Sequence, residues 1–241
     1  MKNFKLFLLS LVALIGLTSC EEELEPQNTN YVTFENDRTL EVTPDGTSSF
    51  DVMVYSANVV GNDRTFNVNV SDASTADPSS YTIGSSVTIP ANSNVGKISL
   101  SVTDTDLDLA NAKTLILNLS EQNGLSLGDG ITLNLLEQCL FNLVNLNITF
   151  DGYSEETQWG IFDAATGNLL ASNSYAAGVS STSEQFCFED GDYVFLILDA
   201  YGDGLSYPED GTVSLTSNGT VLVEVSGNFG DQYQEGFTLG N

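Results

Sequence analysis

Short runs of alternating apolar and polar residues are the feature that most constrains how this chain can fold. They recur from Tyr31 almost to the C-terminus and are separated by turn residues such as Pro44-Asp-Gly and Gly128-Asp-Gly. Alternation with a period of two buries one face of a strand and leaves the other in water, as in antiparallel β-sandwiches. No stretch has a convincing amphipathic helical pattern. The sequence therefore predicts an all-β protein.

The alternating runs form two groups of about eight strands each. We expect the first group at 32–34, 39–42, 50–55, 66–70, 87–89, 98–102, 115–119 and 131–135. We expect the second group at 143–150, 157–162, 168–172, 184–188, 193–198, 212–216, 221–225 and 236–239. Asn218-Gly219 is the strongest hairpin signal in the chain. The predicted organisation is two β-sandwich domains, 31–137 and 138–241, the second of them jelly-roll-like.

The N-terminus carries a targeting signal rather than part of the fold. Lys2 and Lys5 precede an apolar run, residues 6–17, that is too short to predict a membrane span. The run ends in Leu17-Thr-Ser-Cys20, which resembles a bacterial lipobox. The resemblance implies that residues 1–19 are a lipoprotein signal peptide and that lipid on Cys20 anchors the mature protein to a membrane. An ordinary secretory signal followed by a chance cysteine is the alternative.

Residues 20–30 form a polar, acidic tether. The segment Glu21-Glu-Glu-Leu-Glu resembles the tag that sends lipoproteins of Bacteroidota-type bacteria to the outer face of the outer membrane. A solvated acidic linker is the alternative. The resemblance implies a lipid-anchored outer-membrane protein that faces the cell exterior.

The charge of the chain excludes several classes of function. It has 6 basic and 33 acidic residues, a net charge of −27 and no histidine. No segment could neutralise phosphates, so we expect no nucleic-acid partner. The lack of histidine removes the commonest general base and zinc ligand. No basic residue follows Lys113 to polarise a substrate in the second domain, so we expect no enzymatic activity.

Two cysteines remain after lipidation. Cys139 and Cys187 would lie in an exported, oxidising environment, where a disulfide is expected. It would close a loop of roughly fifty residues and contribute about 4 kcal/mol in the chain-entropy model. Two buried free thiols are the alternative.

The first domain contains five segments whose order matches a known motif. They are Tyr31-Val-Thr-Phe, Ala76-Asp77 to Ser80-Tyr81, Gly96-Lys-Ile-Ser-Leu-Ser-Val, Asp104-Thr-Asp-Leu-Asp108 and Lys113-Thr-Leu-Ile-Leu-Asn-Leu. This order resembles the Calx-beta motif and implies an immunoglobulin-like or Calx-beta-like sandwich. The family has acids where this chain has Leu109-Ala-Asn-Ala. We therefore expect a solvated loop at 104–108, with calcium binding by Asp104, Asp106 and Asp108 as the alternative. The expected role of the domain is a spacer or binding platform.

The second domain carries a more specific set, which is Thr149-Phe-Asp-Gly-Tyr, Glu156-Thr-Gln-Trp159, Phe186-Cys-Phe-Glu-Asp-Gly-Asp-Tyr193 and Asp199-Ala-Tyr-Gly-Asp-Gly. It resembles a β-sandwich domain that recurs in secreted and cell-surface proteins of marine and gliding bacteria, often beside peptidases or adhesins. Many members have a cysteine pair after the last glycine, where this chain has Leu205-Ser-Tyr-Pro. The loop lacks that local cysteine pair, so a bound ion would contribute more to holding the loop in one conformation.

The acids of this loop predict a metal site. Asp199 ends an apolar run, Asp203 follows four residues later, and Gly202 and Gly204 permit the positive φ that a tight curl needs. Hard divalent cations with oxygen ligands, Ca²⁺ above all, suit such a loop. The spacing is not that of an EF-hand, because the lead-in is a strand and the third position is a tyrosine. The predicted ligands are Asp199, Asp203 and Asp210, with Asp151 and Glu156 from a second acidic loop. Turn-forming acids without an ion are the alternative.

These features predict a non-enzymatic surface lipoprotein, a calcium-stabilised adhesion or interaction module on a β-sandwich stalk. The alternative is a carbohydrate-binding lipoprotein of a polysaccharide uptake system. Tyr153, Tyr201 and Tyr207 lie beside the acids and would suit stacking on sugar rings, or would pack down on the sandwich. Trp159 starts an alternating run and is expected in the core. The expected ligand is a surface glycan or a protein.

Overall fold

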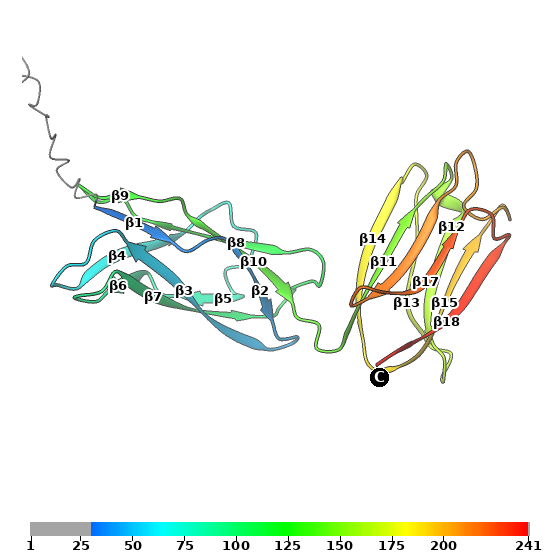
Figure 1. Ribbon diagram of the computed structural model, residues 1–241, viewed down its shortest axis with the longest axis horizontal. Coiled ribbons are helices and arrows are strands. Elements are labelled where there is room, and N and C mark those ends of the chain that lie inside the picture. The colour runs from blue at the N-terminus through cyan, green and yellow to red at the C-terminus, as the bar shows by residue number, and fades with distance from the viewer. Residues whose placement is uncertain (1–29, 241) are drawn as a thin grey trace, which may run out of the picture.

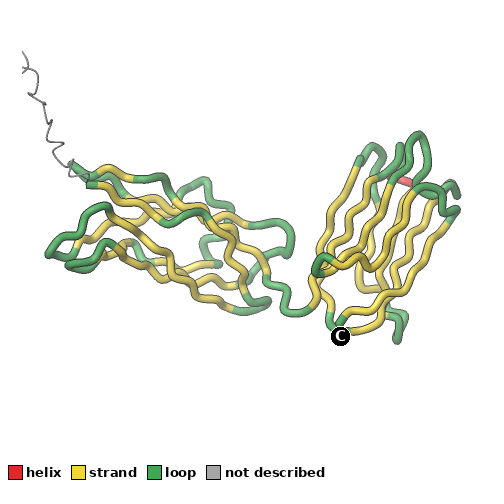
Figure 2. The backbone as a smooth tube through the Cα atoms, in the orientation of Figure 1, coloured by secondary structure: helices red, strands yellow, loops and turns green. Residues whose placement is uncertain are grey.

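The computed structural model describes residues 30–240 and contains two β-sandwiches. Figure 1 shows them as two lobes, and Figure 2 shows that strands and loops make up nearly all of both. No sheet combines strands of the two lobes within the described residues. The predicted all-β class and the two sandwich domains are confirmed.

The first sandwich contains ten strands, β1 (Tyr31–Phe34), β2 (Arg38–Val42), β3 (Thr47–Ser56), β4 (Arg64–Val70), β5 (Tyr81–Ile83), β6 (Ser86–Ile89), β7 (Val95–Thr103), β8 (Lys113–Leu119), β9 (Ser126–Leu127) and β10 (Ile131–Glu137). Its two sheets have the orders β5-β7-β3-β1-β9 and β2-β10-β8-β4-β6. The chain enters in one sheet as β1 and crosses to the other as β2. Both entering strands pair in parallel with late strands, β1 with β9 and β2 with β10.

The second sandwich contains eight strands, β11 (Asn142–Thr149), β12 (Thr157–Asp163), β13 (Leu169–Ser174), β14 (Ser181–Phe188), β15 (Gly191–Asp199), β16 (Thr212–Ser217), β17 (Thr220–Ser226) and β18 (Gln232–Leu239), with the single 3-10 turn η1 (Ser154–Glu156) before β12. Its two antiparallel sheets have the orders β14-β11-β16-β17 and β13-β12-β15-β18. Asn218 and Gly219 join β16 to β17 with φ of 50° and 78°. Two positive φ values are those of the type I′ hairpin that Asn-Gly favours, so this predicted turn is confirmed.

Each sandwich has its own apolar core. Fully buried side chains such as Val52 and Leu115 fill the first, and others such as Ile161 and Phe195 fill the second. Trp159 is 3% exposed and belongs to the second core, as expected. Its Nε1 donates a hydrogen bond to the Tyr175 hydroxyl at 2.8 Å, so the ring is buried with its polar atom satisfied.

A disulfide joins Cys139, which follows β10, to Cys187 in β14, with the two Cα atoms 5.4 Å apart. The predicted pairing is therefore confirmed, and the bond fastens the connection between the lobes to the second sandwich. The predicted signal peptide, Cys20 and nearly all of the tether lie outside the described residues. Within residues 30–240 no helix has the length and apolarity that crossing a bilayer requires.

Candidate metal centre

The predicted ligands lie at the edge of the sheet where β12 begins and β15 ends. The two strands are antiparallel, and Thr157 at the start of β12 lies opposite Asp199 at the end of β15. Glu156 is the last residue of η1, and its carbonyl oxygen accepts a hydrogen bond from the Ala200 amide at 3.0 Å. Residues far apart in the sequence are thereby brought side by side.

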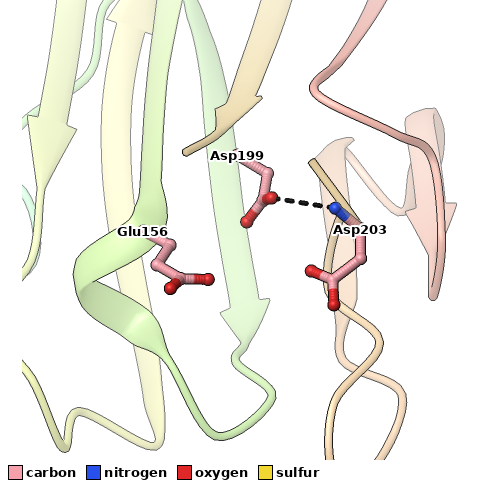
Figure 3. A group of neighbouring side chains, drawn as sticks. All are labelled: Glu156, Asp199 and Asp203. Atoms are coloured by element: carbon pink, nitrogen blue, oxygen red, sulfur yellow. Dashed lines mark hydrogen bonds between the residues drawn. The ribbon is translucent and has the colours of Figure 1, made fainter. Parts of the chain in front are cut away.

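The chain curls tightly after β15. The Asp199 Oδ1 atom accepts hydrogen bonds from the amides of Gly202 and Asp203, the latter at 3.1 Å (Figure 3). Gly202 and Gly204 have φ of 94° and 72°, values that L-residues rarely adopt. At Gly204 a Cβ atom would also lie 2.6 Å from the Phe229 amide nitrogen. These glycines let the curl return the Asp203 carboxylate towards Asp199.

The result is a cluster of three carboxylates, from Glu156, Asp199 and Asp203. One oxygen atom of each lies within 4.8 Å of the others, and Figure 3 shows the three groups around one common space. Calcium binds oxygen at 2.3–2.6 Å, so two ligands of one ion are at most about 5 Å apart. The spacing therefore fits a single calcium ion, and the all-oxygen donor set suits a hard cation rather than zinc.

The electrostatics of the cluster are unfavourable without a cation. Burial raises the pKa of Glu156, and the neighbouring charges of Asp199, Asp203, Glu155 and Asp151 raise it further. No Lys, Arg or His occurs between Thr114 and Asn241 to offset this repulsion. A bound divalent cation would favour the ionised carboxylates instead.

A buried hydroxyl lies on the strand next to Asp199. Thr157 is 1% exposed, and its Oγ1 atom is buried without a hydrogen-bond partner. Because Thr157 and Asp199 are opposite one another in the ladder, their side chains lie on the same face of the sheet, about 5 Å apart at Cβ. An unsatisfied buried hydroxyl costs free energy, and a cation held by the carboxylates would give this oxygen a partner. Thr157 was not among the predicted ligands, although it directly follows Glu156 and begins a strand with alternating buried residues.

The remaining two predicted ligands have other places. The two oxygens of Asp151 accept hydrogen bonds from the amides of Tyr153 at 2.8 Å and Tyr207 at 3.2 Å, so this residue joins two loops. Asp210 is exposed, and its carboxylate lies against Gly227. The structure thus brings together three of the five predicted ligands. Asp151 fixes loops around the cluster.

The acidic loop of the first domain has no comparable cluster among the described residues. Asp104 accepts hydrogen bonds from the amides of Asp45 and Leu107, and Asp108 accepts them from Ala110 and Asn111. These hydrogen bonds shape an exposed loop.

A cavity of about 420 Å³ opens over the carboxylates, lined by Tyr153, Glu156, Tyr201, Asp203 and Tyr207. Tyr201 is 78% exposed. The rings of Tyr153 and Tyr207 stack with centroids 6.0 Å apart and planes 18° from parallel. The site therefore combines an acidic floor with aromatic walls.

Comparisons with known proteins give structural likenesses only. No protein-family model and no curated protein matches the sequence. A multidomain protein including DUF1735 from Bacteroides ovatus is similar at a TM-score of 0.42 and 10% identity, over 86% of this chain and 94% of that one. The apo-form Calx CBD1 domain is similar at a TM-score of 0.36 and 16% identity, over 45% of this chain and 96% of that one. The calcium binding domain CBD12 of CALX1.1 is similar at a TM-score of 0.36 and 11% identity, over 69% of this chain and 77% of that one. Likenesses at this level do not bear on ligand or activity.

Proposed function

We propose that the second sandwich binds one Ca²⁺ ion through Glu156, Asp199 and Asp203, with the Thr157 hydroxyl as a further ligand. The observation that carries the proposal is the set of three carboxylates within 4.8 Å of one another, beside a buried hydroxyl that lacks a partner. The ion would hold η1, the start of β12 and the turn after β15 together. The ion would hold this loop at the position where the family that the chain resembles has a cysteine pair and this chain has none.

We further propose that the domain is a calcium-stabilised interaction module and not an enzyme. The cavity beside it has carboxylates and tyrosines but no Lys, Arg or His to polarise a bond or act as a cationic acid. We place the module on the first sandwich as a stalk, in a lipoprotein anchored through Cys20 on the outer face of the outer membrane. Its partner would be a surface glycan or protein. The tyrosines around the cavity favour the alternative, in which the ligand is a polysaccharide of an uptake system.

Thermal unfolding of the unlipidated chain, residues 21–241, tests the calcium site. Trp159 is the single tryptophan and lies in the second core, so its fluorescence follows the second sandwich alone. An ion that binds only the folded form stabilises it by about 2.7 kcal/mol at one hundred times its Kd. Calcium should therefore raise the unfolding temperature seen by Trp159, and chelator should reverse the effect. Mg²⁺ should do less, because it requires near-octahedral geometry and retains its waters.

Variants assign the response to the site. Asp199→Asn and Asp203→Asn should each reduce the calcium-induced shift, whereas Asp104→Asn in the first sandwich should leave it unchanged. If millimolar calcium produced neither a thermal shift nor binding heat with the parent chain, the proposal would be wrong. Asp199 and Asp203 would then be residues that only shape the turn.

A further inference from the structure

We infer that the cavity over this site binds a neutral sugar, through its hydroxyls to the calcium ion and through its apolar face to Tyr201. The inference rests on the proposed calcium site and names the ligand class that the site takes. It is carried by the juxtaposition of the carboxylate cluster, the cavity and three exposed tyrosines.

The ion would be within reach of any molecule in the cavity. Glu156 and Asp203 belong both to the carboxylate cluster and to the cavity lining. Calcium takes six to eight oxygen ligands, and three carboxylates with one threonine hydroxyl need not fill that number. Because Glu156 and Asp203 also line the cavity, oxygen atoms of a ligand there could take coordination positions that water would otherwise fill.

Two of the three tyrosines that line the cavity, Tyr153 and Tyr207, lie in loops that are joined before any ligand binds. Asp151 holds the amides of Tyr153 and Tyr207 with its two oxygens. The Gly152 amide donates to the Tyr207 carbonyl oxygen at 2.8 Å, and a Cβ atom on Gly152 would lie 2.6 Å from Pro208 Cδ. The loops are therefore packed together without space for another side chain. A wall that is already ordered lowers the entropic cost of binding.

Tyr201 is the free element of the site. It is 78% exposed, more than Tyr207 at 59% and Tyr153 at 43%. Among residues 30–240 no ring packs on it in the way that Tyr153 and Tyr207 pack on one another. Exposed aromatic groups beside a concave site with a few polar groups are typical of binding surfaces. The open face of Tyr201 can cover the C–H face of a pyranose.

Charge selects among ligand classes. Three carboxylates and one divalent cation leave the site with a net charge of about −1, and no basic residue of the domain can pair with an anion. An anionic ligand is therefore disfavoured, and an organic cation would compete with the ion for the carboxylates. A neutral sugar supplies both the oxygen atoms that the ion needs and an apolar face for the ring.

Calorimetric titration of residues 21–241 tests the inference, with neutral hexasaccharides of glucose, mannose, galactose and xylose as probes. Oligogalacturonate and tetramethylammonium represent the anionic and cationic classes. At least one neutral sugar should bind with calcium and lose tenfold or more of its affinity with chelator. By linkage, the same sugar should tighten calcium binding by the same factor.

Tyr201→Ala separates the sugar site from the ion site. It should weaken sugar binding by about tenfold or more, as expected for the loss of an aromatic contact, and should leave the calcium-induced thermal shift unchanged. Tyr55→Ala is the matched control, since Tyr55 is an exposed tyrosine of the first sandwich, 40% accessible, and should alter neither property.

The possible failures are distinct. A calcium shift without binding of any neutral sugar would overturn the inference and leave the calcium proposal standing. Sugar binding that survives chelator or Tyr201→Ala would overturn the assigned contacts. Tetramethylammonium binding that strengthens in chelator would make this an organic-cation site. Absence of the calcium shift would instead remove the proposed function itself.

Discussion

Thr157→Val should have opposite effects on the stability of the second sandwich with and without calcium. The side chain is 1% exposed and its hydroxyl has no hydrogen-bond partner. Valine keeps the β-branched shape that suits a strand and replaces only the hydroxyl with a methyl group. The substitution therefore isolates one oxygen atom in the proposed site.

In the absence of calcium, the hydroxyl is a buried polar group without compensation. Such a group costs about 1–3 kcal/mol, so its removal should stabilise the calcium-free domain by about 1 kcal/mol. For a domain of about one hundred residues, this corresponds to a rise of about 4–8 °C in Tm. With calcium bound, the same change removes a ligand oxygen. Hydrogen bonds to charged groups contribute about 1.5–3 kcal/mol, and a loss of that order should reduce the calcium-induced shift.

The assay is thermal unfolding of residues 21–241 followed by Trp159 fluorescence, in chelator and in saturating calcium. Thr157→Ser retains the hydroxyl and should keep most of the calcium response. Thr238→Val is a second control, because the Thr238 hydroxyl donates to Asp192 Oδ1 at 2.6 Å on the exposed surface. Its effect should be small and equal in both conditions.

Two results would refute this reasoning. If Thr157→Val destabilised the calcium-free domain by several degrees, its hydroxyl must have a partner there. If it left the calcium-induced shift unchanged, Thr157 would not be a ligand of the ion.

Three further predictions concern other parts of the chain. The pKa of Glu156 is raised in the folded state, so near pH 4.5 the calcium-free folded domain holds more of the Glu156 proton than the unfolded chain does. The stability of the calcium-free domain should therefore fall as pH rises from 4.5 through the raised pKa of Glu156. Calcium affinity should increase over the same pH range. Glu156→Gln should remove the Glu156 contribution to the pH dependence of stability and of calcium affinity, each measured as the difference from the parent chain. Reduction of the Cys139–Cys187 bond, which spans 48 residues, should destabilise the second sandwich by about 4 kcal/mol in the chain-entropy model; an unchanged Trp159 transition would contradict it. Cys20→Ala should abolish incorporation of labelled palmitate, and protease added to whole cells should degrade the parent protein, whereas complete protection of the lipidated protein would exclude surface display.

The sequence predicted the strands that bury one face and missed those that lack a clear pattern. β5 and β9 have three and two residues, too few for alternation to be recognised. The C-terminal strand was expected at 236–239 but begins at Gln232. It is an edge strand whose first half has no buried residue, so its pairing with β15 leaves little hydrophobic signal in the sequence.

The local conformation of the acidic loop could be predicted from the sequence, but the approach of separate loops to one another could not. The curl at Asp199 and Asp203 follows from local acids and glycines. Whether Glu156 or Asp210 completes the cluster depends on which strand ends are neighbours, and that is fixed by the β12–β15 pairing. Asp151 was expected as a ligand because it is an acid in a neighbouring loop. Its bonds to two backbone amides depend on the long-range approach of Tyr207, which no local pattern shows.

The direction of β11 places the candidate site at the far end of the second sandwich from its attachment. β11 starts at Asn142, three residues after the disulfide-bonded Cys139, and ends at Thr149, just before Asp151. Its 8 residues span roughly 25 Å. β16 begins at that same far end, where Thr212 lies opposite Thr149. The β12 start and the β15 end lie opposite one another, and the hydrogen bond from Gly152 to Tyr207 joins the loops that leave β11 and β15. In a chain anchored at Cys20, the ion and the tyrosines would therefore face away from the connection to the first sandwich, where a partner outside the cell can reach them. The disulfide and the calcium ion would hold opposite ends of one sandwich, so reduction and chelation should weaken the fold through separate contacts, and their destabilising effects should be nearly additive.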